Sequence, residues 1–105
     1  MTLFERLAAL QTTIDARRGA DPKSSYTAQL LADPARAAKK LGEEAVEAAI
    51  AAAQADAPAL TAEMADVFFH ALTLMAAAGV TPDAVAAELE RREARSGVAE
   101  KASRT

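Results

Sequence analysis

Apolar residues recur at helical spacing near the start of this chain. Leu3, Leu7, Leu10 and Ile14 repeat every three or four positions, and polar or charged residues take the remaining faces. This pattern predicts an amphipathic helix that packs its apolar stripe on the rest of the protein. No segment shows the alternation of apolar and polar residues that is typical of a half-buried strand, so we expect an all-α fold.

Capping and turn residues divide the rest of the chain into four further helices. Asp33 and Thr81 each precede a proline, a pair that typically starts a helix. Ser25 is a capping residue after a segment rich in turn formers, and Gly79 is a helix terminator. The predicted elements are therefore a loop over 19–25, a short helix over about 26–32, and helices over about 34–54, 58–78 and 82–95, the last ended by Ser96-Gly97.

The composition limits how much core one copy of the chain builds. Hydrophobic residues make up 51% of the sequence, but thirty of the 105 residues are alanine and only 4% are aromatic. An alanine-rich helical chain of this length buries little apolar surface alone. We therefore expect a single domain over 1–105, a bundle of four main helices plus a short one, completed by dimerisation.

Charge and cysteine content exclude several classes of function. The formal net charge of −3 argues against sequence-independent binding to nucleic acid. With no cysteine and one histidine, thiolate metal sites and multi-histidine sites within one chain are excluded. The N-terminus lacks a signal-peptide pattern, and the longest apolar stretch, 67–80, contains His70 and is too short to span a bilayer. We expect a cytoplasmic protein that binds no membrane.

Two acidic clusters lie on either side of the predicted turn at 54–58. Glu43, Glu44 and Glu47 fall within about 100° of arc on one helix, and Glu63 and Asp66 follow at i,i+3 on the next. At about 1.5 Å per residue, the clusters are level to within one turn of an antiparallel hairpin. The carboxylates expected to converge on one point are those of Glu44, Glu47, Glu63 and Asp66.

The chemistry of such a cluster suits a hard divalent cation. All-oxygen ligation is typical of Mg²⁺ or Mn²⁺, and four ionised carboxylates around an empty cavity would repel one another. Lys39 and Lys40 lie one turn before the glutamates, where they either form salt bridges along the helix or bind phosphate beside the metal. The arrangement favours attack of water on a phosphoanhydride. From these residues alone, a helical dimerisation module with acidic stripes remains an equal alternative.

Four segments in this order resemble a known family. Segment 43–47 (EEAVE) followed by 63–66 (EMAD) resembles the EExxE…ExxD signature of the all-α, MazG-like nucleoside triphosphate pyrophosphohydrolases. Within that superfamily, SYTAxLL at 25–31, KKLGEEAVE at 39–47, ExADxxxH at 63–70 and RSG…EKASR at 95–104 are similar to phosphoribosyl-ATP pyrophosphohydrolases. Phe68-Phe69 departs from the Leu-Tyr pattern that we expect before the histidine, so the hydroxyl of the expected tyrosine is missing.

The resemblance implies a reaction. Members hydrolyse 1-(5-phosphoribosyl)-ATP to 1-(5-phosphoribosyl)-AMP and pyrophosphate, the second step of histidine biosynthesis, and require Mg²⁺. It also implies a homodimer with an all-helical interface. Some members are fused to the cyclohydrolase of the next step, for which this chain has no room, so we expect the stand-alone form. A housecleaning pyrophosphohydrolase for non-standard nucleotides shares the acidic signature and stays open as an alternative.

The resemblance also implies three groups of site residues. The metal ligands would be Glu44, Glu47, Glu63 and Asp66. The candidates for catalysis are Glu43 and Glu47, of which Glu43 either orients water, ligates a second ion or faces solvent. The residues that would contact substrate phosphates or the phosphoribosyl and nucleotide parts are Lys39, Lys40, Ser25, Tyr26, Arg95 and Lys101.

Overall fold

The computed structural model describes residues 1–95 and residue 101, and these contain five helices and no strand. The helices are α1 (Leu3–Ala16), α2 (Tyr26–Leu31), α3 (Pro34–Ala53), α4 (Ala57–Ala78) and α5 (Pro82–Glu93). The predicted all-α fold of four main helices and a short one is confirmed. The structure ends α5 two residues before the predicted end, and the predicted stop signal at Ser96-Gly97 lies outside the described residues.

Each helix begins at a side chain that caps its first turn. The side chains of Asp33, Asp56 and Thr81 accept hydrogen bonds of 3.0–3.1 Å from backbone N–H groups three residues further on. Ser25 caps α2 in the same way, and Thr2 caps α1. Such a cap is worth about 1 kcal/mol, so local sequence fixes where every helix starts.

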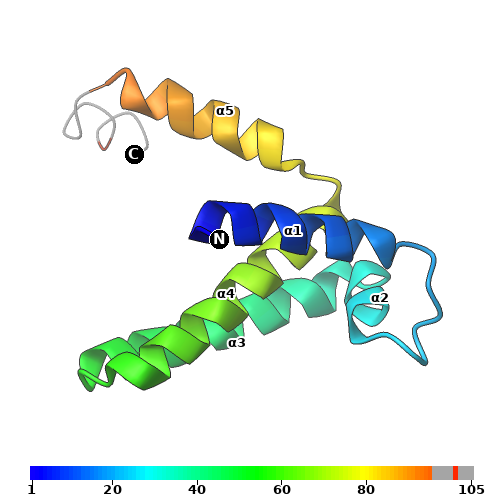
Figure 1. Cartoon of the computed structure of the whole chain (residues 1–105), viewed down its shortest axis with the longest axis horizontal. Coiled ribbons are helices and arrows are strands. Elements are labelled where there is room, and N and C mark those ends of the chain that lie inside the picture. The colour runs from blue at the N-terminus through cyan, green and yellow to red at the C-terminus, as the bar shows by residue number, and fades with distance from the viewer. Residues whose placement is uncertain (96–100, 102–105) are drawn as a thin grey trace.

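α4 is the central helix of the fold. It runs antiparallel along α3 and also contacts α1 and α2 (Figure 1). By length and composition alone α4 could cross a membrane, with 22 residues and a mean hydropathy of 1.2 over its most apolar window. It also carries Glu63, Asp66 and His70, which would be costly to place in hydrocarbon. We therefore interpret its apolar faces as packing surfaces of a helical bundle.

A three-residue turn joins α3 to α4. Gln54 ends α3, Ala55 adopts a left-handed conformation with φ 56°, and Asp56 caps α4. The Asp56 N–H donates to the carbonyl oxygen of Ala51 at 3.1 Å, which satisfies a backbone group at the end of α3. This short connection fixes which residues of the two helices face each other.

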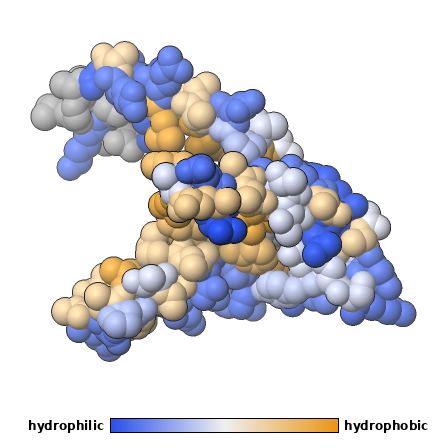
Figure 2. Space-filling model, in the orientation of Figure 1, coloured by the Kyte–Doolittle hydropathy of each residue, from blue (hydrophilic) through white to orange (hydrophobic). Residues whose placement is uncertain are grey.

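The buried core is small and rich in alanine. Among the described residues, seven apolar ones are buried, of which five are alanine and only Ile14 and Leu30 are large. In contrast, Phe4 on α1 and Leu89 on α5 are 79% and 56% exposed. α5 stands apart from α3 (Figure 1), and the space-filling view shows apolar side chains along the notch beneath α5 (Figure 2). One copy of the chain thus leaves much of its apolar surface in contact with water.

Candidate functional site

The turn between α3 and α4 determines which carboxylates meet. Glu44 and Asp66 each lie ten residues from the nearer end of the turn at 54–56, and Glu47 and Glu63 each lie seven residues from it. Equal spacing on the two arms of an antiparallel hairpin puts Glu44 level with Asp66 and Glu47 level with Glu63.

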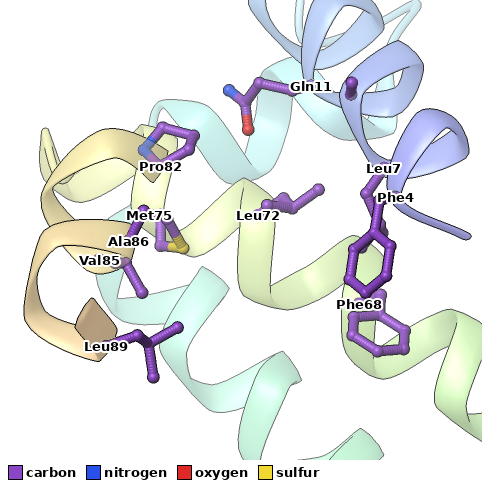
Figure 3. A pocket seen from close by; sticks show the side chains of 11 residues that line it. Phe4, Leu7, Gln11, Phe68, Leu72, Met75, Pro82, Val85, Ala86 and Leu89 are labelled. Carbon is purple, nitrogen blue, oxygen red and sulfur yellow. The ribbon is translucent and has the colours of Figure 1, made fainter. Parts of the chain in front are cut away.

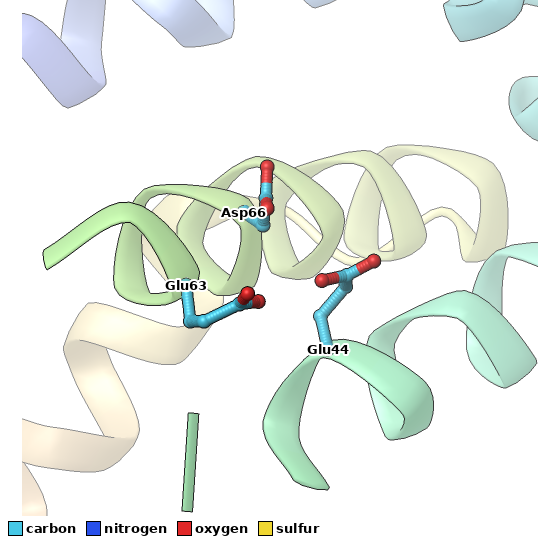
Figure 4. Close-up of side chains that lie close together, drawn as sticks. All are labelled: Glu44, Glu63 and Asp66. Carbon is cyan, nitrogen blue, oxygen red and sulfur yellow. The ribbon is translucent and has the colours of Figure 1, made fainter. Parts of the chain in front are cut away.

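Three of these carboxylates form a compact cluster. One oxygen from each of Glu44, Glu63 and Asp66 lies within 4.8 Å of the others, with Glu44 projecting from α3 and the other two from α4 (Figure 4). Glu44 and Glu63 are half-buried, and Asp66 is exposed. Oxygen donors at this spacing, open to solvent on one side, are the ligand set that Mg²⁺ or Mn²⁺ prefers.

Glu63 is the most constrained member of the cluster. Its Oε2 atom is buried and has no hydrogen-bond partner in the part of the chain that the structure describes. Removal from solvent raises the pKa of Glu63 above its ordinary value, and the carboxylates of Glu47 and Glu44 raise it further. Glu47 is exposed and is close enough to influence Glu63, but it is not one of the three residues whose oxygens lie within 4.8 Å of one another, so its role as a ligand stays a prediction. A buried carboxylate oxygen surrounded by other carboxylates fits a bound cation.

Glu43 faces the lysines of its own helix. Its carboxylate lies 3.2 Å from Lys40 Nζ and 3.9 Å from Lys39 Nζ. The ion pairs that the sequence allowed as one alternative are thus present, although exposed pairs of this kind contribute little to stability. The hydrogen bond that Lys40 donates to Glu43 raises the pKa of Lys40, which keeps a positive charge one turn from the acidic cluster. Phosphate binding by the two lysines stays a prediction.

His70 is buried and hydrogen-bonded one turn beyond Asp66. Its Nδ1 lies 2.9 Å from the backbone oxygen of Asp66, and because a carbonyl only accepts, Nδ1 donates. In the neutral ring Nε2 is then an acceptor, and the Tyr26 hydroxyl donates to it across 3.4 Å. The Phe69 ring stacks on Tyr26 with centroids 6.5 Å apart. These contacts attach α2 to α4 beside the acidic cluster.

Arg36 joins this group, although the sequence pattern did not single it out. Its guanidinium carbon lies 5.8 Å from the centroid of the Tyr26 ring, and Nη1 donates to Gln29 Oε1 at 3.1 Å. The sequence could have indicated Arg36 through its position on α3, because it lies one turn before Lys40 on the same face of the helix.

The remaining predicted contacts lie elsewhere in the fold or outside its described part. Ser25 is half-buried and uses its hydroxyl oxygen to cap α2. Arg95, just after α5, and Lys101 are both exposed, and their predicted contacts to substrate stay predictions. Residues 96–100 lie outside the described residues, so the predicted role of this segment stays a prediction.

The family model described as phosphoribosyl-ATP pyrophosphohydrolase matches residues 7–93. The chain belongs to the phosphoribosyl-ATP pyrophosphohydrolase family. The resemblance to this family is thereby confirmed, and the matched range contains three of the four sequence segments, while the fourth, at 95–104, lies beyond it. The matched range contains every acidic residue of the cluster, both lysines and the Tyr26–His70 contact, whereas Arg95 and Lys101 lie beyond it.

Curated relatives match the chain over nearly all of its length. The phosphoribosyl-ATP pyrophosphatase of Caulobacter vibrioides (strain NA1000 / CB15N) is 63% identical over 102 residues, which cover 97% of this chain and 92% of that protein. The enzyme of the same name from Methylobacterium radiotolerans is 61% identical over 99 residues, which cover 93% of this chain and 92% of that protein. That from Cereibacter sphaeroides (strain ATCC 17025) is 56% identical over 105 residues, covering 99% of each chain.

Glu63→Gln is expected to stabilise the metal-free protein at pH 7, since it removes a charge that burial and two neighbouring carboxylates disfavour. The pKa of Glu63 is higher in the folded protein than its ordinary value of 4.5. Protonated Glu63 therefore stabilises the folded state at a pH below 4.5, and this stabilisation is lost as the pH rises through the pKa of the folded protein. Thermal unfolding in chelator between pH 5 and 8 measures this: the advantage of Glu63→Gln over wild type should grow with pH. Glu88, whose pKa Arg91 and Arg92 lower to about 2, does not titrate in this window.

The same variant separates cation binding from general stability. Mg²⁺ or Mn²⁺ should raise the melting temperature of the wild type and leave that of Glu63→Gln unchanged. Glu90→Gln, which removes one exposed charge from α5, is the matched control and should keep the response of the wild type. Equal cation-dependent stabilisation of Glu63→Gln and wild type would contradict the site.

Proposed function

We propose that this chain hydrolyses 1-(5-phosphoribosyl)-ATP to 1-(5-phosphoribosyl)-AMP and pyrophosphate, the second step of histidine biosynthesis, in the cytoplasm. The observation that supports this proposal most is the cluster of Glu44, Glu63 and Asp66, in which one oxygen of each residue lies within 4.8 Å of the others, in a member of this family. Relatives up to 63% identical, named phosphoribosyl-ATP pyrophosphatase, support the choice of substrate.

Four carboxylates would hold the metal, which we propose to be Mg²⁺, with Mn²⁺ as a substitute: those of Glu44, Glu47, Glu63 and Asp66. A bound Mg²⁺ would neutralise the negative charge of the triphosphate and of the departing pyrophosphate. Lys39 and Lys40 stand one turn away on α3 and would hold phosphate oxygens. The buried Glu63 oxygen, which lacks a partner among the described residues, supports this assignment because a cation would satisfy it.

The chain's own carboxylates would handle the attacking water. Glu47 is exposed at the edge of the cluster, where it would orient a water molecule and accept its proton. The water oxygen bonds to phosphorus, the bridging bond between the α and β phosphates breaks, and pyrophosphate leaves. Glu43 is held by Lys39 and Lys40, so it would position the lysines that meet the phosphates or orient the water from that side.

We also propose that the protein acts as a homodimer. A groove of about 610 Å³ runs between α1, α4 and α5, and its walls are almost entirely apolar (Figure 3). Gln11 Oε1 is buried on its wall without a hydrogen-bond partner within the described residues. A monomer rarely exposes so much contiguous apolar surface, and a second copy would cover it. The large apolar side chains of the groove are Phe4, Leu7, Phe68, Leu72, Met75, Val85 and Leu89.

The purified protein is expected to release pyrophosphate from phosphoribosyl-ATP in the presence of Mg²⁺ and to stop when a chelator is added. The rate should exceed the rates on ATP and on non-standard nucleoside triphosphates. Turnover of other triphosphates without turnover of phosphoribosyl-ATP would favour the housecleaning alternative. No turnover of any of them would favour a helical module without catalytic activity.

Glu47→Ala is expected to lower the rate of pyrophosphate release by at least ~100-fold, because it removes a metal ligand and the candidate base. Its circular dichroism spectrum should match that of the wild type, since Glu47 is exposed and alanine favours helix. Glu90→Ala on α5 is the control for loss of an exposed glutamate and should leave the rate unchanged. A near-normal rate for Glu47→Ala would remove the assigned role.

Val85→Asp is expected to convert a dimer into monomers, since it puts a charge into the apolar groove, where Val85 is 38% exposed. Sedimentation velocity should report about twice the 10.9 kDa chain mass for the wild type and the chain mass for the variant. Ser24→Asp adds the same charge in the loop before α2 and should stay dimeric. A monomeric wild type at micromolar concentration would refute the assignment.

A further inference from the structure

Arg36 is exposed and is held by neutral partners. Arg18, Lys40 and Arg91 each lie within 4 Å of a carboxylate oxygen. Within the described residues, the guanidinium of Arg36 instead contacts the amide oxygen of Gln29 and the ring of Tyr26. Its positive charge is therefore oriented without being neutralised, which is the condition that favours binding of an anion.

The partners of Arg36 are themselves fixed. Gln29 Nε2 donates to the backbone oxygen of Pro22 at 2.8 Å, which leaves Gln29 Oε1 pointing at the guanidinium. The Tyr26 ring is held by its hydroxyl bond to His70 and by stacking on Phe69. An exposed arginine ordinarily loses rotamer freedom when it binds a ligand. Here much of that ordering is already present in the free protein.

Arg36 lies in line with the acidic cluster. It precedes Lys40 by one helical turn and Glu44 by two, which corresponds to about 12 Å along the axis of α3. Lys40 lies close enough to Tyr26 and Glu44 to interact electrostatically with both. One continuous surface thus runs from a cation site, past a lysine, to an arginine supported by an aromatic ring. Such a surface suits a long ligand with anionic groups at both ends.

We propose that Arg36 binds the 5-phosphate of the phosphoribosyl group and thereby selects phosphoribosyl-ATP over ATP. The inference rests on the proposed function, in which the triphosphate occupies the acidic cluster and the lysines. The second phosphate of this substrate is at the opposite end of the molecule, and ATP lacks it. The planar fork of a guanidinium matches two phosphate oxygens at once. Arg36 is accordingly a residue for specificity and takes no part in breaking the bond between the α and β phosphates.

The kinetic test compares Arg36→Ala with Arg6→Ala. Alanine at position 36 favours helix and keeps the backbone N–H that donates to the capping side chain of Asp33. Arg6 is an exposed residue of α1 whose replacement removes the same charge. For Arg36→Ala, KM for phosphoribosyl-ATP should rise about ten- to a hundredfold with kcat nearly unchanged, as expected for one charge-assisted contact. kcat/KM for ATP should not change, and Arg6→Ala should resemble the wild type. Equal loss on both substrates, or no loss, would overturn the proposal.

A binding test needs no turnover. Calorimetry with phosphoribosyl-AMP and AMP compares two ligands that differ only in the phosphoribosyl group. The wild type should prefer phosphoribosyl-AMP, and Arg36→Ala should lose most of that preference while Arg36→Lys keeps part of it. A preference that survives in Arg36→Ala overturns the role of Arg36 even if hydrolysis is intact. Conversely, failure of the wild type to hydrolyse phosphoribosyl-ATP, with the Arg36-dependent preference present, rejects the proposed reaction and retains the phosphate site.

Discussion

Repulsion between like charges on α3 and α4 is the constraint to which the rest of the structure responds. The hairpin holds Glu44, Glu63 and Asp66 together although burial and the carboxylates of Glu47 and Glu44 disfavour the ionised form of Glu63 and raise its pKa. Helix packing and a three-residue turn supply the force that keeps them there, with Ala55 in a left-handed conformation that alanine seldom adopts. Such a cluster favours binding of a cation, because a cation neutralises the carboxylates and takes their oxygens as ligands.

The surface around the cluster is graded in charge along α3. The carboxylates of Glu44 and Glu47 lie in the middle of α3, Lys40 precedes Glu44 by one turn, and Arg36 lies at the far end, in the first turn of the helix, beside Tyr26. The bond from His70 to the Asp66 carbonyl links this far end to the backbone that carries a candidate metal ligand. The short helix α2 is therefore part of the site, since it supplies the ring and the amide that orient Arg36.

Sequence alone predicted what depends on local chemistry and spacing. Capping residues such as Asp33 and Thr81 act on the backbone three residues further on, so they predict where a helix starts. Glu44 and Asp66 lie at equal distances from the turn, and this spacing predicts that they meet. The Tyr26–His70 contact joins residues 44 positions apart and depends on how α2 packs, which no local pattern specifies. Glu43 shows the same limit. Its position on the helix allows its carboxylate to face either the acidic cluster or the two lysines, and in the structure it forms ion pairs with Lys39 and Lys40.

The abundance of alanine connects the site to the assembly. Small side chains such as Ala48 and Ala51 on α3 let two helices approach closely, and close approach is what brings short carboxylate side chains from both helices to one point. The same small side chains bury little apolar surface, so a single copy gains little free energy from its core. The large apolar residues lie instead on α1, α4 and α5, around the groove on the other side of α4. The composition that lets α3 and α4 approach closely also leaves a large apolar groove exposed on a single copy, which is the surface that the proposed dimer would bury.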